Sequence, residues 1–517
     1  MRNSPSPNNH QAGAANITVI ALLVVSFLSA IVLGNLIAQG DFLTAYLGLL
    51  AVLGIVALQQ LKSTFWLLIP FAMVSQLPAI SIIVASLTLG ELWILASLVF
   101  VIFYWIQERR SLTGAFSGPG IWMYAYLIWA LLVLASNPVG LSFTGAASGG
   151  LRFYLKIILG FIAFLIIANS ELDNKFSRRL IVLLIAGVAA EAAFKLLGAY
   201  VPQISFLTAQ GAGSALAGGG FYGVTAKISI VPALVAPFLL ARYSFAEMIQ
   251  PKNWWVIVTL LVLVAMSFLS GKRSLTVLLF MYPVIIALIR GQLVKAIGLG
   301  MPAFGAFALL LLLQASGVTL PKTTQRVLSI IPGVTGLDYD VIKSADNDFR
   351  ETLNRFALVE IKEKPLIGDG FKMDQEMLYY LDSNPDKVLG LDDHIAGARY
   401  AATSAWHNTW LGMSADFGIP AALIFALLMI FYIRKSLWLL KRLEPKSSQY
   451  LLVIGLLAIV IGELLRSYQF GHACHTYWQI SWKVGVLFAI ENALKLQARM
   501  EFHEAENRRT SSKVVTN

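Results

Sequence analysis

The feature that most constrains this chain is a series of apolar runs, each close to 20 residues long, separated by short charged segments. A helix needs roughly 20 apolar residues to cross a bilayer, and in lipid its backbone must satisfy its own hydrogen bonds. The runs lack the period-2 alternation that is typical of transmembrane β-strands. Only 13% of the residues are charged, whereas a soluble domain carries about a quarter. The sequence therefore predicts an all-α fold, a polytopic bundle of transmembrane helices.

The runs predict about fourteen spans. The polar residues 1–16 lead into a full-length span, which indicates a first transmembrane helix and not a cleaved signal. The predicted spans are 17–38, 42–61, 65–77, 91–106, 120–135, 151–168, 180–199, 226–240, 254–269, a tenth that ends at residue 289, 296–315, 419–433, 450–465 and 477–493. We interpret residues 78–89 as a re-entrant or interfacial segment.

These spans give the chain a simple predicted organisation. A cytoplasmic N-terminal tail (1–16) precedes transmembrane helices one to eleven (17–316), and a large loop with short helices (317–405) follows. Transmembrane helices twelve to fourteen (406–493) and a C-terminal tail (494–517) complete the chain. Cys474 is the only cysteine, so we expect no intrachain disulfide.

Basic residues between the spans predict the orientation. If the N-terminus is cytoplasmic and each span crosses once, most of the loop cations lie inside, as the positive-inside bias requires. These cations are Lys62, Arg109, Arg110, Arg178, Arg179, Arg242, Lys252, Arg290, Lys295, Arg434, Lys435, Lys441 and Arg442. Both termini are then cytoplasmic and the large loop faces the periplasm. The net charge of +11 follows from this bias and does not indicate a nucleic-acid partner.

The large loop contains the longest polar segment outside the tails, and its pattern predicts helices. Asp348 lies at a capping position, an apolar stripe includes Leu353 and Ala357, and Pro365 ends the helix. A turn at Gly368 and Gly370 follows. We further expect Ser404 to cap a helix through Ala415, and Gly418-Ile419-Pro420 to break or kink the chain before the twelfth span.

Several cations are predicted on the periplasmic face. Arg273 lies between two spans on the face where short-loop cations are disfavoured. A functional role is therefore favoured over the alternative, a side chain that only extends to the lipid headgroups. Arg152, Lys156 and Lys227 lie at span ends on the same face, and each alone is read as structural. Taken alone, Arg355 is typical of an arginine on a helix surface. Taken alone, His407 is typical of a histidine whose hydrogen bonds are made within the protein.

Together, two arginines and a histidine on one face suit an anionic lipid-linked donor and a hydroxyl acceptor. Guanidinium groups present a planar fork to a diphosphate, and histidine suits acid–base chemistry near neutral pH.

Other patterns are weaker: His472, Cys474 and His475 lack an evident carboxylate partner, so no metal site is predicted. Glu191 is expected to pair with Lys195. Glu463 and Arg466 either form an ion pair or line a cavity.

Three motifs carry a family resemblance: Gly271-Lys272-Arg273-Ser274, Asn354-Arg355-Phe356 followed by Lys364-Pro365-Leu366-Ile367-Gly368-Asp369-Gly370, and His407-Asn408-Thr409-Trp410 with Phe417-Gly418-Ile419-Pro420. Over roughly residues 227–434, the chain resembles the superfamily of O-antigen ligases and Wzy-type O-antigen polymerases. The resemblance implies a GT-C-like fold in the bacterial inner membrane, with an active site that faces the periplasm. It also implies an inverting glycosyltransferase that needs no metal or other cofactor and uses a glycan on undecaprenyl diphosphate.

By this resemblance, Arg273 and Arg355 would bind the diphosphate, and His407 would orient or deprotonate the acceptor hydroxyl. Lys227, Arg152 and Asn408 are the further expected substrate-binding residues. The number of spans favours a polymerase of repeat units over an en bloc ligase that transfers glycan to lipid A-core or protein. A chain-length regulator and a flippase are the expected protein partners. A secondary transporter is the alternative from another class, although no internal repeat is visible.

Overall fold

The computed structural model describes much of the chain after residue 65. The described residues are 66–75, 79–82, 85–88, 116–138, 150–200, 230–270, 272–292, 307–329, 334–338, 348–371, 406, 408–467 and 473–515, with single positions at 91, 93–95, 97, 98, 228, 294 and 305. The chain divides into two compact units, Met1–Trp66 and Leu67–Asn517. The fold below is that of the second unit. The first two predicted spans lie outside the described residues.

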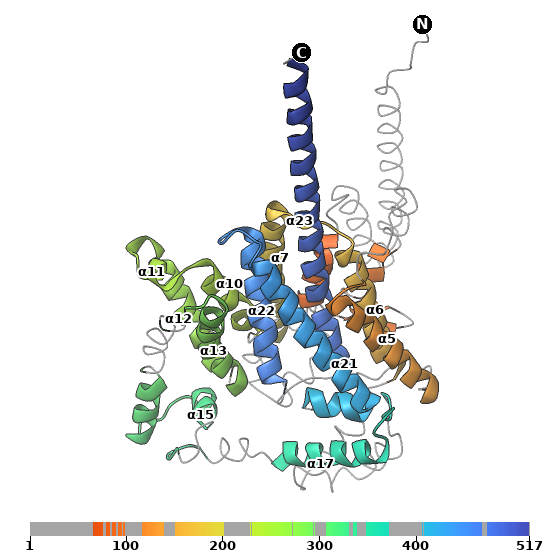
Figure 1. Ribbon diagram of the computed structural model, residues 1–517. Coiled ribbons are helices and arrows are strands. Elements are labelled where there is room, and N and C mark those ends of the chain that lie inside the picture. Colours follow the sequence, from red (N-terminus) through yellow and green to blue (C-terminus); the bar gives the residue numbers. More distant parts are fainter. Residues whose placement is uncertain are drawn as a thin grey trace, which may run out of the picture. The chain divides into compact units, whose positions relative to one another are not determined.

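The described part of the second unit is almost entirely helical (Figure 1). Its helices are α3 (Leu68–Ser75), α5 (Pro119–Ser136), α6 (Leu151–Ala168), α7 (Asn174–Tyr200), α10 (Ile230–Arg242), α11 (Phe245–Met248), η5 (Pro251–Asn253), α12 (Trp254–Leu269), α13 (Arg273–Ile289), α15 (Lys322–Leu328), α17 (Asp348–Glu363), α21 (Thr409–Leu440), α22 (Ser448–Arg466) and α23 (Ala473–Val515). Two short strands, β1 (Ala79–Ile82) and β2 (Ala85–Thr88), pair antiparallel with Ala79 opposite Thr88. The segment interpreted as re-entrant or interfacial is therefore a hairpin, a small exception to the all-α prediction.

Several predicted spans coincide with helices. The predictions for α6 and α12 match to the residue, and α5 extends its prediction by one residue at each end. The helix α7 begins six residues before its predicted start, because the carboxylate of Asp173 accepts the Phe176 N–H (2.7 Å) and caps an earlier turn. The helix α23 continues beyond residue 493 to Val515, since the tail is rich in strong helix formers.

The length and composition of these helices make this a membrane protein. Four helices among the described residues are long and apolar enough to span a bilayer: Pro119–Ser136, Pro251–Leu269, Thr409–Leu440 and Ser448–Arg466. The helix α12 also exposes a broad apolar face, with Leu261 63% exposed and Val262 52% exposed. A face of this kind is what lipid tails would cover. The figure of about fourteen spans stays a prediction.

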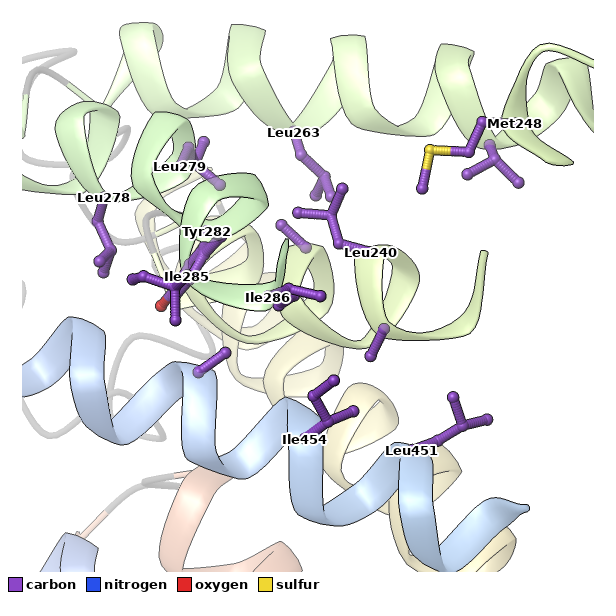
Figure 2. Packing of buried hydrophobic residues seen from close by; sticks show 14 residues of the cluster. Leu240, Met248, Leu263, Leu278, Leu279, Tyr282, Ile285, Ile286, Leu451 and Ile454 are labelled. Atoms are coloured by element: carbon purple, nitrogen blue, oxygen red, sulfur yellow. The ribbon is translucent and has the colours of Figure 1, made fainter. Parts of the chain in front are cut away.

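One apolar core joins α10, α12, α13 and α22 (Figure 2). Leu263 of α12 and Leu240 of α10 point toward each other, and Ile454 of α22 faces the same layer. Glycines bring these helices close together. A Cβ at Gly455 would lie 2.4 Å from Phe238, and one at Gly462 would lie 2.5 Å from Leu278. Small residues at such crossings let transmembrane backbones approach each other.

Candidate functional site

The helix α21 is broken near its start. Gly418 has φ 79° and ψ 166°, which divides the helix into a first arm, Thr409 to Phe417, and a long second arm. Pro420 follows two residues later. Proline has no N–H and its ring clashes with the carbonyl four residues earlier, here that of Asp416. The kink predicted from Gly418-Ile419-Pro420 is therefore confirmed.

The break leaves carbonyls of the first arm without their usual helical donors, and a loop supplies the replacements. We call residues 364–371 the docking loop. Within it, Asp369 N–H donates to Ala415 O (3.0 Å) and Gly370 N–H donates to Asp416 O (2.7 Å). In return, Ile419 N–H donates to Pro365 O (2.8 Å). Because backbone N–H and C=O groups inside a protein need hydrogen-bond partners, these bonds fix the docking loop at the kink.

The two backbones meet so closely that glycine is required on both sides. A Cβ at Gly418 would lie 2.0 Å from the carbonyl oxygen of Leu366. A Cβ at Gly368, whose φ is +67°, would lie 2.5 Å from Ala415 O. The turn predicted from Gly368 and Gly370 is thus confirmed, and its partner is the helix break.

Residues within α5 and at the ends of α5 and α6 hold both the docking loop and the first arm of α21. Trp129 Nε1 of α5 donates to Phe417 O (2.8 Å), and Asn137 Nδ2 donates to Gly368 O (3.0 Å). Just before α6, Gly150 N–H donates to Phe371 O (3.1 Å). Arg152 lies two residues beyond Gly150, so its backbone belongs to this junction; its side chain lies outside the described residues.

The helix α17 packs on the first arm of α21, as the predicted apolar stripe requires. Leu353 and Ala357 of α17 form a buried cluster with Trp406 and Ala415. The indole of Trp406 donates to the carboxylate of Asp416 (2.8 Å), a buried hydrogen bond. These contacts place α17 against the segment that leads into α21. Arg355, on the same helix, is exposed.

Asn408 caps α21, and this corrects the prediction that Ser404 does so. Its side-chain oxygen accepts the N–H groups of Trp410 (3.0 Å) and Leu411 (3.2 Å), so the helix begins at Thr409. Asn408 is buried. The capping bonds occupy its oxygen and orient the chain next to position 407. His407 itself lies outside the described residues.

The end of α22 meets the start of α21. Thr409 N–H donates to Ser467 O (2.9 Å), and Trp410 Nε1 donates to the Ser467 hydroxyl (2.8 Å). The helices α13 and α22 run antiparallel: in Figure 2, Leu278, Tyr282 and Ile286 succeed one another in the direction opposite to Leu451 and Ile454. Leu278 contacts Gly462.

This antiparallel packing also places the start of α13. Leu278 lies five residues after Arg273 and Gly462 lies five residues before Ser467, about 7.5 Å along each helix. The Arg273 backbone is therefore at the same end of the bundle as Ser467 and Thr409. The Arg273 side chain lies outside the described residues, as does Lys227.

An ion pair between α22 and α23, near the C-terminal end of α22, was not predicted from the sequence. Both oxygens of Glu463 lie 2.6 Å from Lys483 Nζ on α23. The Lys483 side chain is 2% exposed and the Glu463 side chain 44%. Glu463 therefore does form an ion pair, with Lys483 as a partner in a different helix. A lysine inside an apolar run was the available signal, because an ionisable residue in a span needs a partner.

The predicted Glu191–Lys195 pair stays a prediction, since the Lys195 side chain lies outside the described residues. Glu191 itself is buried. No group of three histidines, cysteines or acidic residues that could hold a metal occurs in the described parts of the chain. His472, Cys474 and His475, at which no metal site was predicted, fall outside those parts, in position or in side chain.

The described contacts bring together four elements that carry predicted site residues. The starts of α6 and α21 and the helix α17 meet around the first arm of α21, either directly or through the docking loop. The start of α13 lies at the same end of the bundle through its packing on α22. No protein-family model matches this chain, and a search of curated proteins finds no match either.

Proposed function

We propose that this protein is a membrane glycosyltransferase that acts on glycans linked to undecaprenyl diphosphate. The observation that carries this proposal is the convergence just described. Arg152, Arg273, Arg355 and Asn408 are far apart in sequence, yet the elements that bear them gather at one end of the helix bundle. The resemblance of the surrounding motifs to O-antigen ligases and Wzy-type polymerases supports the same activity.

In the proposed reaction, a hydroxyl oxygen of the acceptor sugar attacks the anomeric carbon of the donor. The bond between that carbon and the diphosphate oxygen breaks, and the configuration inverts. The hydroxyl proton passes to His407, and undecaprenyl diphosphate leaves as the anion. Arg273 and Arg355 stabilise the negative charge that grows on the diphosphate, and their planar forks suit two phosphoryl oxygens. Lys227 and Arg152 add positive charge around the headgroup.

The product that we propose is a longer glycan on the same lipid, as in O-antigen or exopolysaccharide polymerisation. A GT-C-like bundle of about fourteen spans in the bacterial inner membrane, with the site on the periplasmic face, belongs to this proposal. An en bloc ligase would use the same donor chemistry and differ only in its acceptor. The two activities therefore need a product assay to distinguish them.

The assay uses the full chain in liposomes with one undecaprenyl-diphosphate-linked repeat unit and measures the size of the lipid-linked product. A ladder of longer chains establishes a polymerase. Transfer that appears only after lipid A-core or an acceptor protein is added establishes a ligase. Absence of turnover with the cognate repeat unit and with either acceptor would contradict the proposal and favour a transporter.

Arg355 gives the sharpest test of the site because it lies exposed on a packed helix. We expect Arg355→Ala to lower turnover about 100-fold, the usual effect of removing one charge-stabilising donor. Arg355→Lys should fall between Ala and wild type, since lysine keeps the charge but loses the fork. Lys362→Ala is the matched control, an exposed cation on the same helix. Equal activity in Arg355→Ala and Lys362→Ala would remove Arg355 from the site.

A further inference from the structure

The second arm of α21 carries a groove of about 520 Å³ near its C-terminal end. The groove is lined by one face of the helix, at positions three and four residues apart: Ile430, Ile433, Arg434, Leu437, Trp438 and Lys441. Its lining is thus apolar over most of its length and cationic at two positions. The apolar side chains are open to an occupant, since Ile430 is 58% exposed.

The positive charge at this groove is not compensated within the described part of the chain. Lys435, on a neighbouring face, forms an ion pair with Glu491. Arg434 and Lys441 have no carboxylate partner among the described residues. Arg442 adds a third cation, with its guanidinium carbon 4.0 Å from the ring centroid of Trp438. An occupant with an apolar chain and an anionic headgroup would match both the apolar and the cationic parts of this groove.

We propose that the groove binds an anionic phospholipid of the membrane. An acyl chain lies along Ile430, Ile433 and Leu437, and the phosphate lies between Arg434 and Lys441. These two cations are two helical turns apart, about 10.5 Å, so their long side chains reach a phosphate placed between them. Trp438 occupies the interfacial position that indole prefers.

The predicted topology places this end of α21 at the cytoplasmic leaflet, where anionic lipids attract basic segments. The proposed lipid is therefore bound at the opposite side of the membrane from the proposed active site. The inference does not depend on the glycosyltransferase proposal, because it uses neither the donor nor any residue of that site.

The experiment measures quenching of Trp438 by brominated lipids in the full-length protein. The protein is reconstituted in phosphatidylcholine vesicles that contain a small fraction of brominated phosphatidylglycerol or, separately, brominated phosphatidylcholine. The chain has 12 tryptophans, so the Trp438 signal is the difference between wild type and Trp438→Phe. We expect brominated phosphatidylglycerol to quench this signal at a lower mole fraction than brominated phosphatidylcholine does.

Substitutions of the two cations test the headgroup contact. Arg434→Gln and Lys441→Gln should each weaken the preference for phosphatidylglycerol about fivefold, the effect of one cation near an anionic surface. Arg499→Gln is the matched control, because Arg499 is an exposed cation on α23 outside the groove lining. Thermal unfolding of each variant, unchanged from wild type, shows that the bundle is intact.

Three outcomes would overturn the proposal. Equal quenching by both lipids, or a preference that survives in the double variant Arg434→Gln/Lys441→Gln, would show that no anionic headgroup is recognised. Protection of Trp438 from both lipids, together with a dimer in size measurements, would assign the groove to a second copy of the chain.

Discussion

The closest backbone approach at the site predicts the effect of a single methyl group. In Gly418→Ala, the new Cβ would fall 2.0 Å from Leu366 O, so the docking loop must move away from α21. Three hydrogen bonds then weaken, those from Asp369, Gly370 and Ile419, worth about 0.5–1.5 kcal/mol each. The backbone conformation of Gly418 adds about 1–3 kcal/mol of strain for any other residue. We therefore expect a local loss of about 3 kcal/mol, near the lower end of the sum of these effects.

Hydrogen exchange of the amides of Asp369 and Gly370 is the direct assay, because both bonds join the docking loop to the kink. A loss of about 3 kcal/mol raises the population of the opened state about 100-fold, so exchange should accelerate by that factor. Gly291→Ala is the control: Gly291 has φ +67°, but a Cβ there meets no atom within 4 Å. Its positive φ also disfavours alanine, but the contact is absent. Gly291→Ala should leave exchange in the docking loop unchanged. If Gly418→Ala also leaves it unchanged, the reasoning about the junction is refuted.

Two further predictions concern ion pairs outside the junction. Glu463→Leu should destabilise the protein more than Lys483→Met does, because the first leaves a buried cation and the second a half-exposed carboxylate. Chemical denaturation measures both, and the opposite order would contradict the assigned burial. The hydrogen bond from Lys446, with those from Ser244, lowers the pKa of Glu247 to about 2. The folded pKa is depressed, so the stabilisation is present above the ordinary value near 4.5 and is lost as the pH falls toward 2. Because the pair lies at the surface the effect is small, and Glu247→Gln should remove this part of the pH dependence of unfolding.

The sequence pattern correctly predicted those helices whose ends coincide with the ends of an apolar run. The boundaries of α6 and α12 were predicted to the residue because glycine or polar residues flank each apolar run. The prediction was wrong where polar residues continue a helix, as in α23. Hydropathy marks the extent of lipid contact, whereas helix ends depend on capping and propensity. The start of α21 illustrates this, because the cap is Asn408 and not Ser404.

The parts of the candidate site were predictable, and their assembly was not. Pro365 and the glycines of the docking loop predicted a helix end and a turn, and Pro420 predicted a kink. Nothing in either segment shows that the turn supplies the donor that Pro420 removes, because that match exists only in three dimensions. The Glu463–Lys483 pair was missed for the same reason, since it joins two helices and has no helical spacing along the chain.

The exchange of hydrogen bonds at Gly418 also limits how this end of the molecule can move. The docking loop completes the hydrogen bonding of α21, so it cannot swing open as an independent flap without breaking the helix that it completes. Together with α17 and the first arm of α21, it forms one block, and bonds from Ile419, Asn137 and Gly150 tie this block to the second arm of α21 and to the ends of α5 and α6. Opening the molecule at the kink would therefore break bonds on both sides of Gly418 at once, so the amides of this junction are expected to exchange as one cooperative unit.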